Sequence, residues 1–340
     1  MRHKLTNRCD SAFVAACEVF GGDICVTQSA RTARVLIWLA LCLLMLAGCG
    51  VNPQPTPQNA ATPPGEGHVL VIGDISDEAA ETINGTQPIA DYLAERLVAF
   101  GIVRAEVKIA PDLDTMVRWM ADGTVDLYFD SPYPALVISQ ETGAVPILRR
   151  WKYGVSEYHS LFFARVDAGL SSLEDLRGHL IAFEEPFSTS GYMLPLSYLV
   201  EHGLAASVQN APGAAVNPNE VGYVFSTADN TTIQWVVSRR VMAGVVDNIT
   251  YERFIPEETR AELVVLAETE SVPRQMVLVR SGMDADLQQA IKEELLAMDK
   301  NEAGQTALDV FLTTKFDVFP EGADVALARM RTLYELVQGQ

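Results

Sequence analysis

From about His68 to its end, the sequence alternates short β-type runs with longer runs of amphipathic helical period. "HVLVIGDI" precedes "TQPIADYLAERLVAFG", and "AEVKIA" precedes "DLDTMVRWMADG". The same order returns further along, where "HLIAFEE" leads into "STSGYMLPLSYLVEHGL". This alternation is typical of βαβ units, which form a mostly parallel sheet with helices on its faces. We therefore expect an α/β fold.

The alternating body is long enough for two hydrophobic cores, and the alternation is interrupted between Gly154 and His159. We predict two lobes, each a mostly parallel sheet flanked by helices, with a hinge and a central cleft. The first lobe is assigned to residues 68–155 and the second to residues 156–248. Residues 249–340 are expected to return to the first lobe and to end in helices.

The first 67 residues have a different character. All five cysteines lie within the first 49 positions, so the body contains no disulfide and no cysteine metal site. "VLIWLALCLLMLA", behind Arg31 and Arg34, suits the apolar region of a signal peptide and is too short to span a bilayer comfortably. It ends in Leu-Ala-Gly-Cys, which resembles the lipobox of bacterial lipoproteins and makes Cys49 the predicted lipidation site.

Residues 1–48 are therefore predicted to be a signal peptide with an over-long N-terminal extension, and the Pro-rich residues 49–67 a tether. A plain signal peptide or a short anchor helix is the alternative. The prediction implies an exported protein of the cell envelope, anchored by lipid to a membrane. The sequence holds 44 acidic and 25 basic residues, a formal net charge of −19. This balance argues against a nucleic-acid partner, although a local site can oppose the overall charge.

Polar side chains follow several predicted strands of both lobes. Asp130-Ser131, residues 188–191, residues 226–230 and Asp247-Asn248 all occupy such positions. In open α/β sheets, ligands bind beyond the carboxyl ends of the strands. The sequence therefore predicts a ligand-binding cleft between the lobes.

Hydroxyl side chains cluster where a helix is predicted to begin after "IAFEEPF". Ser188, Thr189 and Ser190 are followed by Gly191. A helix N-terminus presents unpaired N–H groups and about half a positive charge, so extra hydroxyl donors and a glycine that admits close approach can form an anion site. An ordinary N-cap is the competing interpretation. The run of three hydroxyls after a strand favours contact with an anion.

The segment "YHSLFFARVDAGLSSLEDLRGHLIAFEEPFSTSGYMLPLSYLVEHGL" resembles the phosphate/phosphite/phosphonate-binding lipoproteins of ABC importers. A Tyr-x-Ser strand, a Ser-Leu-x-Asp-Leu-x-Gly helix and a Ser-Thr-Ser-Gly-Tyr-x-x-Pro segment recur in that family in this order. The resemblance extends to "DGTVDLYFDSPYPALV" upstream and "RRVMAGVVDNITYE" downstream. It implies a two-lobed, hinge-closing periplasmic binding protein (type II), with Ser188, Thr189 and Ser190 on the oxyanion of the ligand.

The chain departs from the family pattern at positions that bear on the ligand. Ser131-Pro132 stands where the family has Gly-Pro, and Ala135 stands where an aromatic residue is usual, so Tyr133 is the expected substitute. Asp229 occupies a position where the family often has His. Because an ionised carboxylate repels an anion, either the ligand carries a proton or an amine for Asp229, or the ligand is not phosphonate-like.

The strand-end positions and the resemblance together give the candidate ligand contacts, with His159 expected either to contact the ligand or to hydrogen-bond at the hinge. These candidates are Ser131, Tyr133, Tyr158, His159, Ser188, Thr189, Ser190, Gly191, Asp229 and Asp247.

No nucleophile-elbow motif and no closely spaced zinc ligands are found in the body, so we expect no catalytic residue, no metal and no cofactor. The predicted function is a monomeric solute-binding lipoprotein that delivers a phosphonate-, phosphite- or phosphate-like oxyanion to a membrane ABC permease. The alternatives are a ligand-sensing subunit for a membrane kinase or cyclase, and an enzyme on the same fold that uses Ser190 or His159.

Overall fold

The computed structural model describes residues 67–76 and 78–339. The predicted signal peptide, Cys49 and the tether up to residue 66 lie outside the described residues. Within the described ranges, the structure contains no helix both long and apolar enough to cross a membrane.

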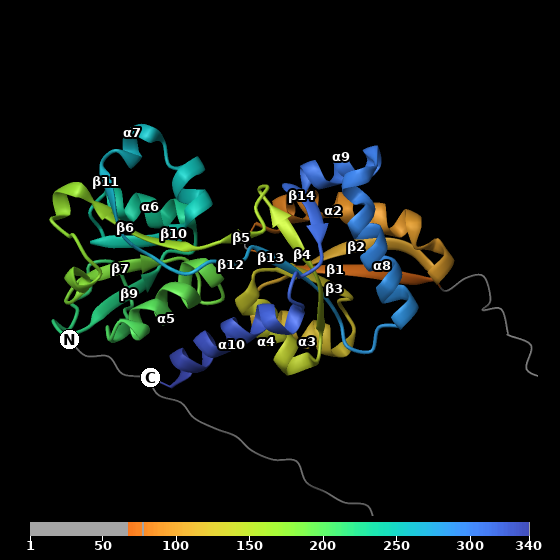
Figure 1. The fold of residues 1–340 in the computed structure, drawn as a ribbon, viewed down its shortest axis with the longest axis horizontal. Coiled ribbons are helices and arrows are strands. Elements are labelled where there is room, and N and C mark those ends of the chain that lie inside the picture. The colour runs from red at the N-terminus through yellow and green to blue at the C-terminus, as the bar shows by residue number, and fades with distance from the viewer. Residues whose placement is uncertain (1–66, 77, 340) are drawn as a thin grey trace, which may run out of the picture. The chain divides into compact units, whose positions relative to one another are not determined.

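The first lobe is built on a six-stranded sheet of order β14-β4-β13-β3-β1-β2 (Figure 1). Its strands are β1 (His68–Ile75), β2 (Ile102–Ala110), β3 (Leu127–Asp130), β4 (Val145–Lys152), β13 (Gln275–Val279) and β14 (Thr313–Asp317). Its helices are α2 (Ala79–Arg96), α3 (Leu113–Asp122), α4 (Pro132–Thr142), α8 (Ala285–Ala297), α9 (Glu302–Val310) and α10 (Ala323–Gln338). Separate apolar clusters pack on the two faces of this sheet.

The second lobe is built on a six-stranded sheet of order β11-β6-β10-β7-β9-β8. Its strands are β6 (Ser160–Arg165), β7 (Leu180–Phe183), β8 (Ala206–Val208), β9 (Val221–Phe225), β10 (Ala243–Asp247) and β11 (Leu263–Glu268). Its helical segments are η4 (Thr189–Met193), α5 (Leu194–Glu201), α6 (Asp229–Val237), η5 (Thr250–Phe254) and α7 (Glu257–Arg260). Two apolar clusters again cover its faces.

Two strand segments carry the chain from one lobe to the other. The chain leaves the first lobe through β4 and β5 (Glu157–Tyr158) and returns through β12 (Val272–Pro273) and β13. β5 and β12 pair antiparallel, with Tyr158 opposite Val272, and Figure 1 shows them between the two sheets. We refer to β4, β5, β12 and β13 as the crossing strands.

The α/β fold is confirmed, and each sheet contains both parallel and antiparallel pairs; in the second sheet the pairs of β7 with β10, β7 with β9 and β8 with β9 are parallel. In the first sheet β13 runs antiparallel to β3 and β4, and in the second β6 runs antiparallel to β10 and β11. The reason lies in the crossings. β6 and β13 arrive from the other lobe, so each begins at the edge where its neighbours end: Ser160 pairs with Asp247, and Met276 with Asp130.

The return to the first lobe also comes later than the expected boundary at residue 249. β11 pairs antiparallel with β6 and forms the edge of the second sheet. The chain therefore leaves the second sheet only after Glu268. The run "LVVLAE" carries no signal that says to which sheet it belongs, because edge pairing is a long-range contact.

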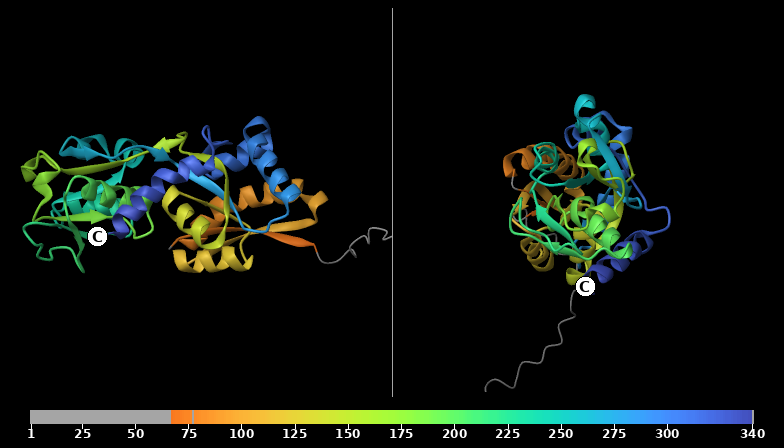
Figure 2. Two further views of the ribbon diagram at one scale, coloured as in Figure 1. Left: turned by 60° about the horizontal axis from the view of Figure 1, so that its bottom comes forward. Right: turned by 90° about the vertical axis from the view of Figure 1, so that its left-hand side faces the viewer.

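The last helix contacts both lobes. α10 packs on α4 of the first lobe and on α5 of the second, and Figure 2 shows it running alongside both. Arg329 of α10 donates to Glu201 at the end of α5 (2.9 Å) and to Glu270 after β11 (2.8 Å).

Candidate functional site

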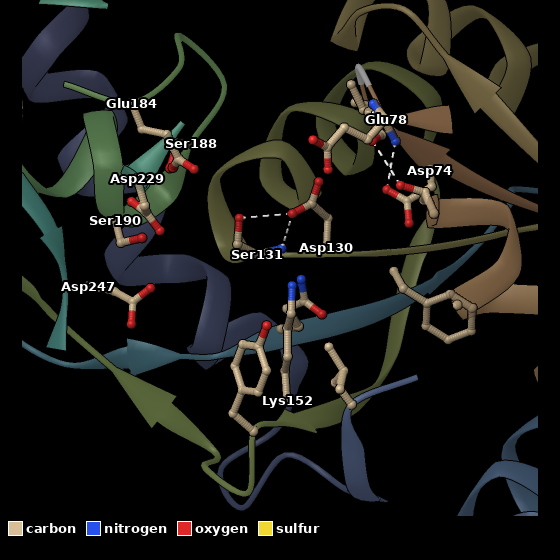
Figure 3. A pocket seen from close by; sticks show the side chains of 18 of the residues that line it. Asp74, Glu78, Asp130, Ser131, Lys152, Glu184, Ser188, Ser190, Asp229 and Asp247 are labelled. Atoms are coloured by element: carbon tan, nitrogen blue, oxygen red, sulfur yellow. Dashed lines mark hydrogen bonds between the residues drawn. The ribbon is translucent and has the colours of Figure 1, made fainter. Parts of the chain in front are cut away.

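A cavity of about 1090 Å³ lies between the strand ends of the two lobes. The first lobe supplies one wall, from the ends of β1 and β3, and the second lobe supplies the other, from the residues after β7, β9 and β10. The crossing strands β4, β5 and β13 form what we call the floor (Figure 3). Eight carboxyl side chains and three basic side chains line the cavity. The carboxyls belong to Asp74, Glu78, Glu81, Asp130, Glu184, Glu185, Asp229 and Asp247, and the basic groups to Arg150, Lys152 and Arg274.

The wall of the first lobe is the start of α4. Ser131 is the N-cap of this helix, and Pro132 occupies its first turn, where a missing N–H costs no hydrogen bond. The Asp130 carboxylate accepts hydrogen bonds from the backbone N–H of Ser131 (2.6 Å), from the Ser131 hydroxyl (3.0 Å) and from the Tyr128 hydroxyl. The Ser131 hydroxyl proton therefore points to a carboxylate of its own lobe.

The wall of the second lobe repeats this arrangement at the start of η4. The Ser188 hydroxyl accepts from the N–H of Gly191 (2.9 Å) as an N-cap and donates to the Glu184 carboxylate (2.7 Å). A Cβ at position 191 would lie 2.4 Å from Cβ of Glu184 and 2.7 Å from Oε2 of the same residue. Glycine is therefore required here by the close packing of Glu184 over the first helical turn.

Thr189 connects the two walls directly. Its buried hydroxyl donates to Oγ of Ser131 (2.9 Å) and accepts from the backbone N–H of Tyr133 (2.9 Å). The start of η4 thus touches the start of α4, and the lobes are in contact beside the cavity.

A second acidic group lies deeper in the wall of the second lobe. The Thr250 hydroxyl lies 3.1 Å from both Asp229 Oδ2 and Asp247 Oδ2, and Asp247 also accepts from the N–H groups of Ile249 and Thr250. Burial, and then the charges of Glu184 and Asp247, raise the pKa of Asp229 well above its ordinary value. Burial also raises the pKa of Glu184 to about 7.

The acids of the first lobe are shifted in the same direction. Burial, and then the charge of Asp130, raise the pKa of Asp74 to about 7, and burial raises the pKa of Asp130. Near neutral pH, these groups can hold protons and donate hydrogen bonds.

The floor holds the basic groups. Arg150 is structural, because its guanidinium donates to Thr313 Oγ1 (2.7 Å), Gln275 Oε1 (2.6 Å) and the Phe311 carbonyl oxygen (2.5 Å). Arg274 is 8% exposed, stacks on Tyr158 and lies 3.7 Å from Asp247, and its Nε has no hydrogen-bond partner among the described residues. Lys152 extends from the floor toward the space between the walls (Figure 3).

The junction before α6 is strained. Thr227, which lines the cavity, has a φ of 70°, in the left-handed region that a β-branched residue rarely adopts. Its N–H donates to the Glu184 carbonyl oxygen (2.9 Å). Strain of this kind is concentrated at functional sites, and here it lies two residues before Asp229, the first residue of α6.

The structure brings six of the ten candidate contacts together at the cavity: Ser131, Tyr158, Ser188, Ser190, Asp229 and Asp247. Thr189 and Gly191 lie behind this surface, in the contacts described above. Tyr133 packs against Tyr192 and Tyr334 in an apolar cluster. The ring of His159 lies 3.6 Å from the Glu268 carboxylate, on the neighbouring strand β11.

Sequence reasoning missed the floor. Lys152 and Arg274 belong to no recognisable motif, but the strand-like runs around them contain an indication of a site. Charged residues inside the strand-like runs "AVPILRRWK" and "SVPRQMVLV" are unusual in buried strands unless they have a partner or a ligand. No set of three His, Cys, Asp or Glu side chains in residues 67–76 and 78–339 is arranged to hold a metal ion.

The chain is similar to known solute-binding proteins. Residues 72–321 match the family described as "ABC transporter, phosphonate, periplasmic substrate-binding protein". The phosphate-import protein PhnD of Mycolicibacterium smegmatis is 28% identical over 206 residues, which cover 58% of this chain. The match spans 62% of the length of that protein.

Two solved structures are also similar. XAC2383 from Xanthomonas citri bound to ATP is 30% identical, with a TM-score of 0.72 over 80% of this chain and 96% of that one. PhnD1 from Prochlorococcus marinus (MIT 9301) in complex with methylphosphonate is 16% identical, with a TM-score of 0.63 over 80% of this chain and 99% of that one. The likeness to PhnD1 bears on the fold alone.

Proposed function

Because this chain belongs to the phosphonate periplasmic substrate-binding family of ABC transporters, we propose that it captures a small solute carrying a phosphonate, phosphite or phosphate-like group between its lobes and delivers it to a membrane permease. The observation that carries this proposal is the cavity itself. Two helix starts from different lobes face it, and two basic groups lie on its floor: Lys152, which forms no ion pair with the described residues, and Arg274, whose guanidinium lies 3.7 Å from the Asp247 carboxylate. The protein binds its ligand and releases it unchanged.

The acidic residues of the walls are compatible with an anionic ligand. Asp229 stands at a position that is often His in the family. An ionised Asp229 would repel an anion, so a proton is needed between the two groups. The raised pKa of Asp229 means that its own carboxyl group can hold this proton. No amine on the ligand is then required.

A second candidate is a larger phosphorylated solute with an aromatic group. The cavity, at about 1090 Å³, is at the upper end of the range for small-molecule sites, of roughly 300–1,000 Å³, and far exceeds the needs of a simple oxyanion. Phe187, Tyr153 and Phe254 line it, and the last two rings pack edge to face with centroids 5.4 Å apart. The likeness to an ATP-bound protein from X. citri supports a nucleotide as the probe for this candidate.

Binding measurements test the proposal. Isothermal titration calorimetry of the full chain with methylphosphonate, phosphite, phosphate and ATP should show saturable binding of at least one ligand at 1:1 stoichiometry. Sulfate is the matched control for charge and shape. Native mass spectrometry of freshly purified protein would identify a co-purifying solute. Failure of all four ligands, together with an unliganded native mass, would refute the proposed ligand class.

The lipid anchor is part of the same proposal. Cys49 should carry the lipid, and Cys49→Ser should move the protein from the membrane fraction to the soluble fraction, because one acylated cysteine is expected to be the attachment point. A Cys42→Ser variant is the matched control. Sedimentation of Cys49→Ser with salt-washed membranes would contradict lipid anchoring without affecting the ligand proposal.

A further inference from the structure

The two walls and the floor differ in which hydrogen-bond donors are already used. The hydroxyl protons of Ser131, Ser188 and Thr189 are directed to Asp130, Glu184 and Ser131, respectively. Within the described part of the chain, the Ser190 hydroxyl donates to no carboxylate, and its side chain lies close to the Tyr158 hydroxyl. Burial raises the pKa of Tyr158 to about 12, so this phenol remains a donor at neutral pH. Hydroxyl groups that do not donate to a carboxylate therefore converge where the second wall meets the floor.

A positive charge with an unsatisfied donor lies at the same place. The Arg274 guanidinium stacks on the Tyr158 ring at 4.3 Å, and its buried Nε lacks a partner among the described residues. An unsatisfied buried donor of a charged group is costly, and an acceptor supplied by a ligand removes that cost.

Lys152 completes the group. Its ammonium stacks loosely on Tyr153 at 5.6 Å and forms no hydrogen bond or ion pair with the described residues. Burial, and then the positive charges of Arg274 and Arg150, lower the pKa of Lys152 to about 8. Cations that destabilise one another in this way gain from an anion between them.

We propose that the oxyanion of the solute binds on the floor of the cleft, contacted by Lys152 and Arg274 together with the hydroxyls of Ser190 and Tyr158. This assignment rests on the proposed function, and it makes Lys152 and Arg274 the residues that select for negative charge. The rest of the solute then extends between the walls, toward Asp74 and Asp130 on one side and Glu184 and Asp229 on the other.

Because Lys152 and Arg274 lie on the segments that join the lobes, they can bind the anion before the lobes close. Lys152 ends β4, and Arg274 lies between β12 and β13, so both belong to the segments that join the lobes. An anion held there is in place before the walls close, because its two charged contacts do not depend on how far apart the lobes are. The walls then contribute contacts that differ between the open and closed arrangements.

The test compares Lys152→Met with the native full chain in calorimetric titrations with methylphosphonate, phosphite and phosphate. Losing one charge-assisted contact is expected to weaken binding by about ten- to hundredfold. Arg274→Gln should weaken binding by a similar factor. Lys108→Met is the matched control, because Lys108 stacks on Trp119 in the first lobe and does not line the cavity. The thermal midpoint of unliganded Lys152→Met should not fall, since this ammonium forms no ion pair with the described part of the chain.

The outcomes separate this assignment from the proposed function. If the native protein binds and both Lys152→Met and Arg274→Gln bind equally well, the floor assignment is wrong and the proposed function stands. If the native protein binds none of the three anions, both are wrong. Should Lys152→Met fold poorly, Lys152→Arg, which keeps the charge, and Lys152→Gln, which removes it, carry the test: recovery by Arg alone supports the assignment, and equal binding by both overturns it.

Discussion

The walls and the floor of the cleft carry charges of opposite sign, and they differ most in how these charges are partnered. On the walls, the carboxylates of Asp130 and Glu184 accept hydrogen bonds from the hydroxyls of Ser131 and Ser188, the N-cap residues of their own lobes. On the floor, Lys152 forms no ion pair with residues 67–76 and 78–339, and Arg274 has a longer ion pair, 3.7 Å, with Asp247. The charges that a ligand can use are therefore on the floor.

Because of this difference, the number of acidic and basic side chains does not give the charge that a ligand meets in the cleft. A count of eight carboxyls against three basic groups predicts a site for cations. Burial, however, raises the pKa values of Asp74 and Glu184 to about 7, so these acids are partly neutral at neutral pH. The effective charge of the walls thus changes around pH 7, whereas Lys152 on the floor, with its pKa lowered to about 8, loses its charge at somewhat higher pH.

Comparing Ser190→Ala with Ser188→Ala tests whether the Ser190 hydroxyl contributes more to anion binding than the Ser188 hydroxyl, which caps η4. Ser190→Ala should weaken anion binding by about ten- to hundredfold, since it removes a donor to a charged group. Ser188→Ala should mainly lower stability, by about 1 kcal/mol, because it removes an N-cap. Calorimetry and thermal melts of both variants measure the two effects. Equal binding losses would show that the helix tip, and not the floor, holds the anion.

Asp229→Asn tests whether this wall acid is neutral when the anion binds. Near pH 6 the variant should bind about as well as the native protein, because Asn also offers a neutral donor. As pH rises through the pKa of Asp229, native binding should weaken more than binding by the variant, because the loss of charge from Lys152, whose pKa is about 8, is common to both. The gap should grow to about tenfold for each unit by which the anion raises that pKa. Titrations from pH 6 to pH 9 measure it, and parallel curves would contradict a protonated Asp229.

The acids at Asp74 and Glu184 should also appear in the stability of the unliganded protein. Their folded pKa values, about 7, lie above the unfolded values, about 4, so the stabilisation is present below pH 4 and is lost as pH rises to 7. Asp74→Asn and Glu184→Gln should each flatten the fall in Tm between pH 4.5 and pH 7.5 by about 2 °C or more. Asp91→Asn, on the surface of α2, is the control. Unchanged slopes in both variants would show that the walls are ionised throughout this range.

Thr189→Val tests the direct contact between the walls with the smallest expected effect. The change removes two hydrogen bonds between the lobes while nearly preserving side-chain volume. Affinity should fall by about three- to tenfold, because the closed arrangement becomes less favourable. Small-angle X-ray scattering should show a larger radius of gyration for unliganded Thr189→Val, and saturating ligand should restore the native value. Identical profiles for native and variant protein would show that this contact does not control closure.

Much of the cleft could be predicted because strand ends and helix starts have local signatures. Asp130-Ser131 and the Ser188 run follow apolar strands directly, and α/β topology places such positions on one edge of each sheet. The two lobes followed from the same alternation. The family resemblance, confirmed by the match over residues 72–321, added the order of the segments.

The remainder depends on contacts that sequence does not display. Lys152 and Arg274 are far apart along the chain and come together because β4 pairs with β13 and β5 pairs with β12. The direction in which a hydroxyl donates is equally non-local: Thr189 turns to Ser131 in the other lobe. Gly191 was assigned to ligand approach, but the structure gives it a packing role under Glu184.

The contact of α10 with both lobes means that the affinity of this protein can be adjusted at a distance from its ligand. Arg329 links α10 to Glu201 and Glu270 of the second lobe, and none of these residues lines the cavity. Apparent affinity is the intrinsic affinity multiplied by the fraction of molecules already in the binding-competent arrangement. Substitutions along the C-terminal helix would change that fraction alone. Evolution could thus match the capture threshold to a scarce or an abundant nutrient while the residues that recognise it stay fixed.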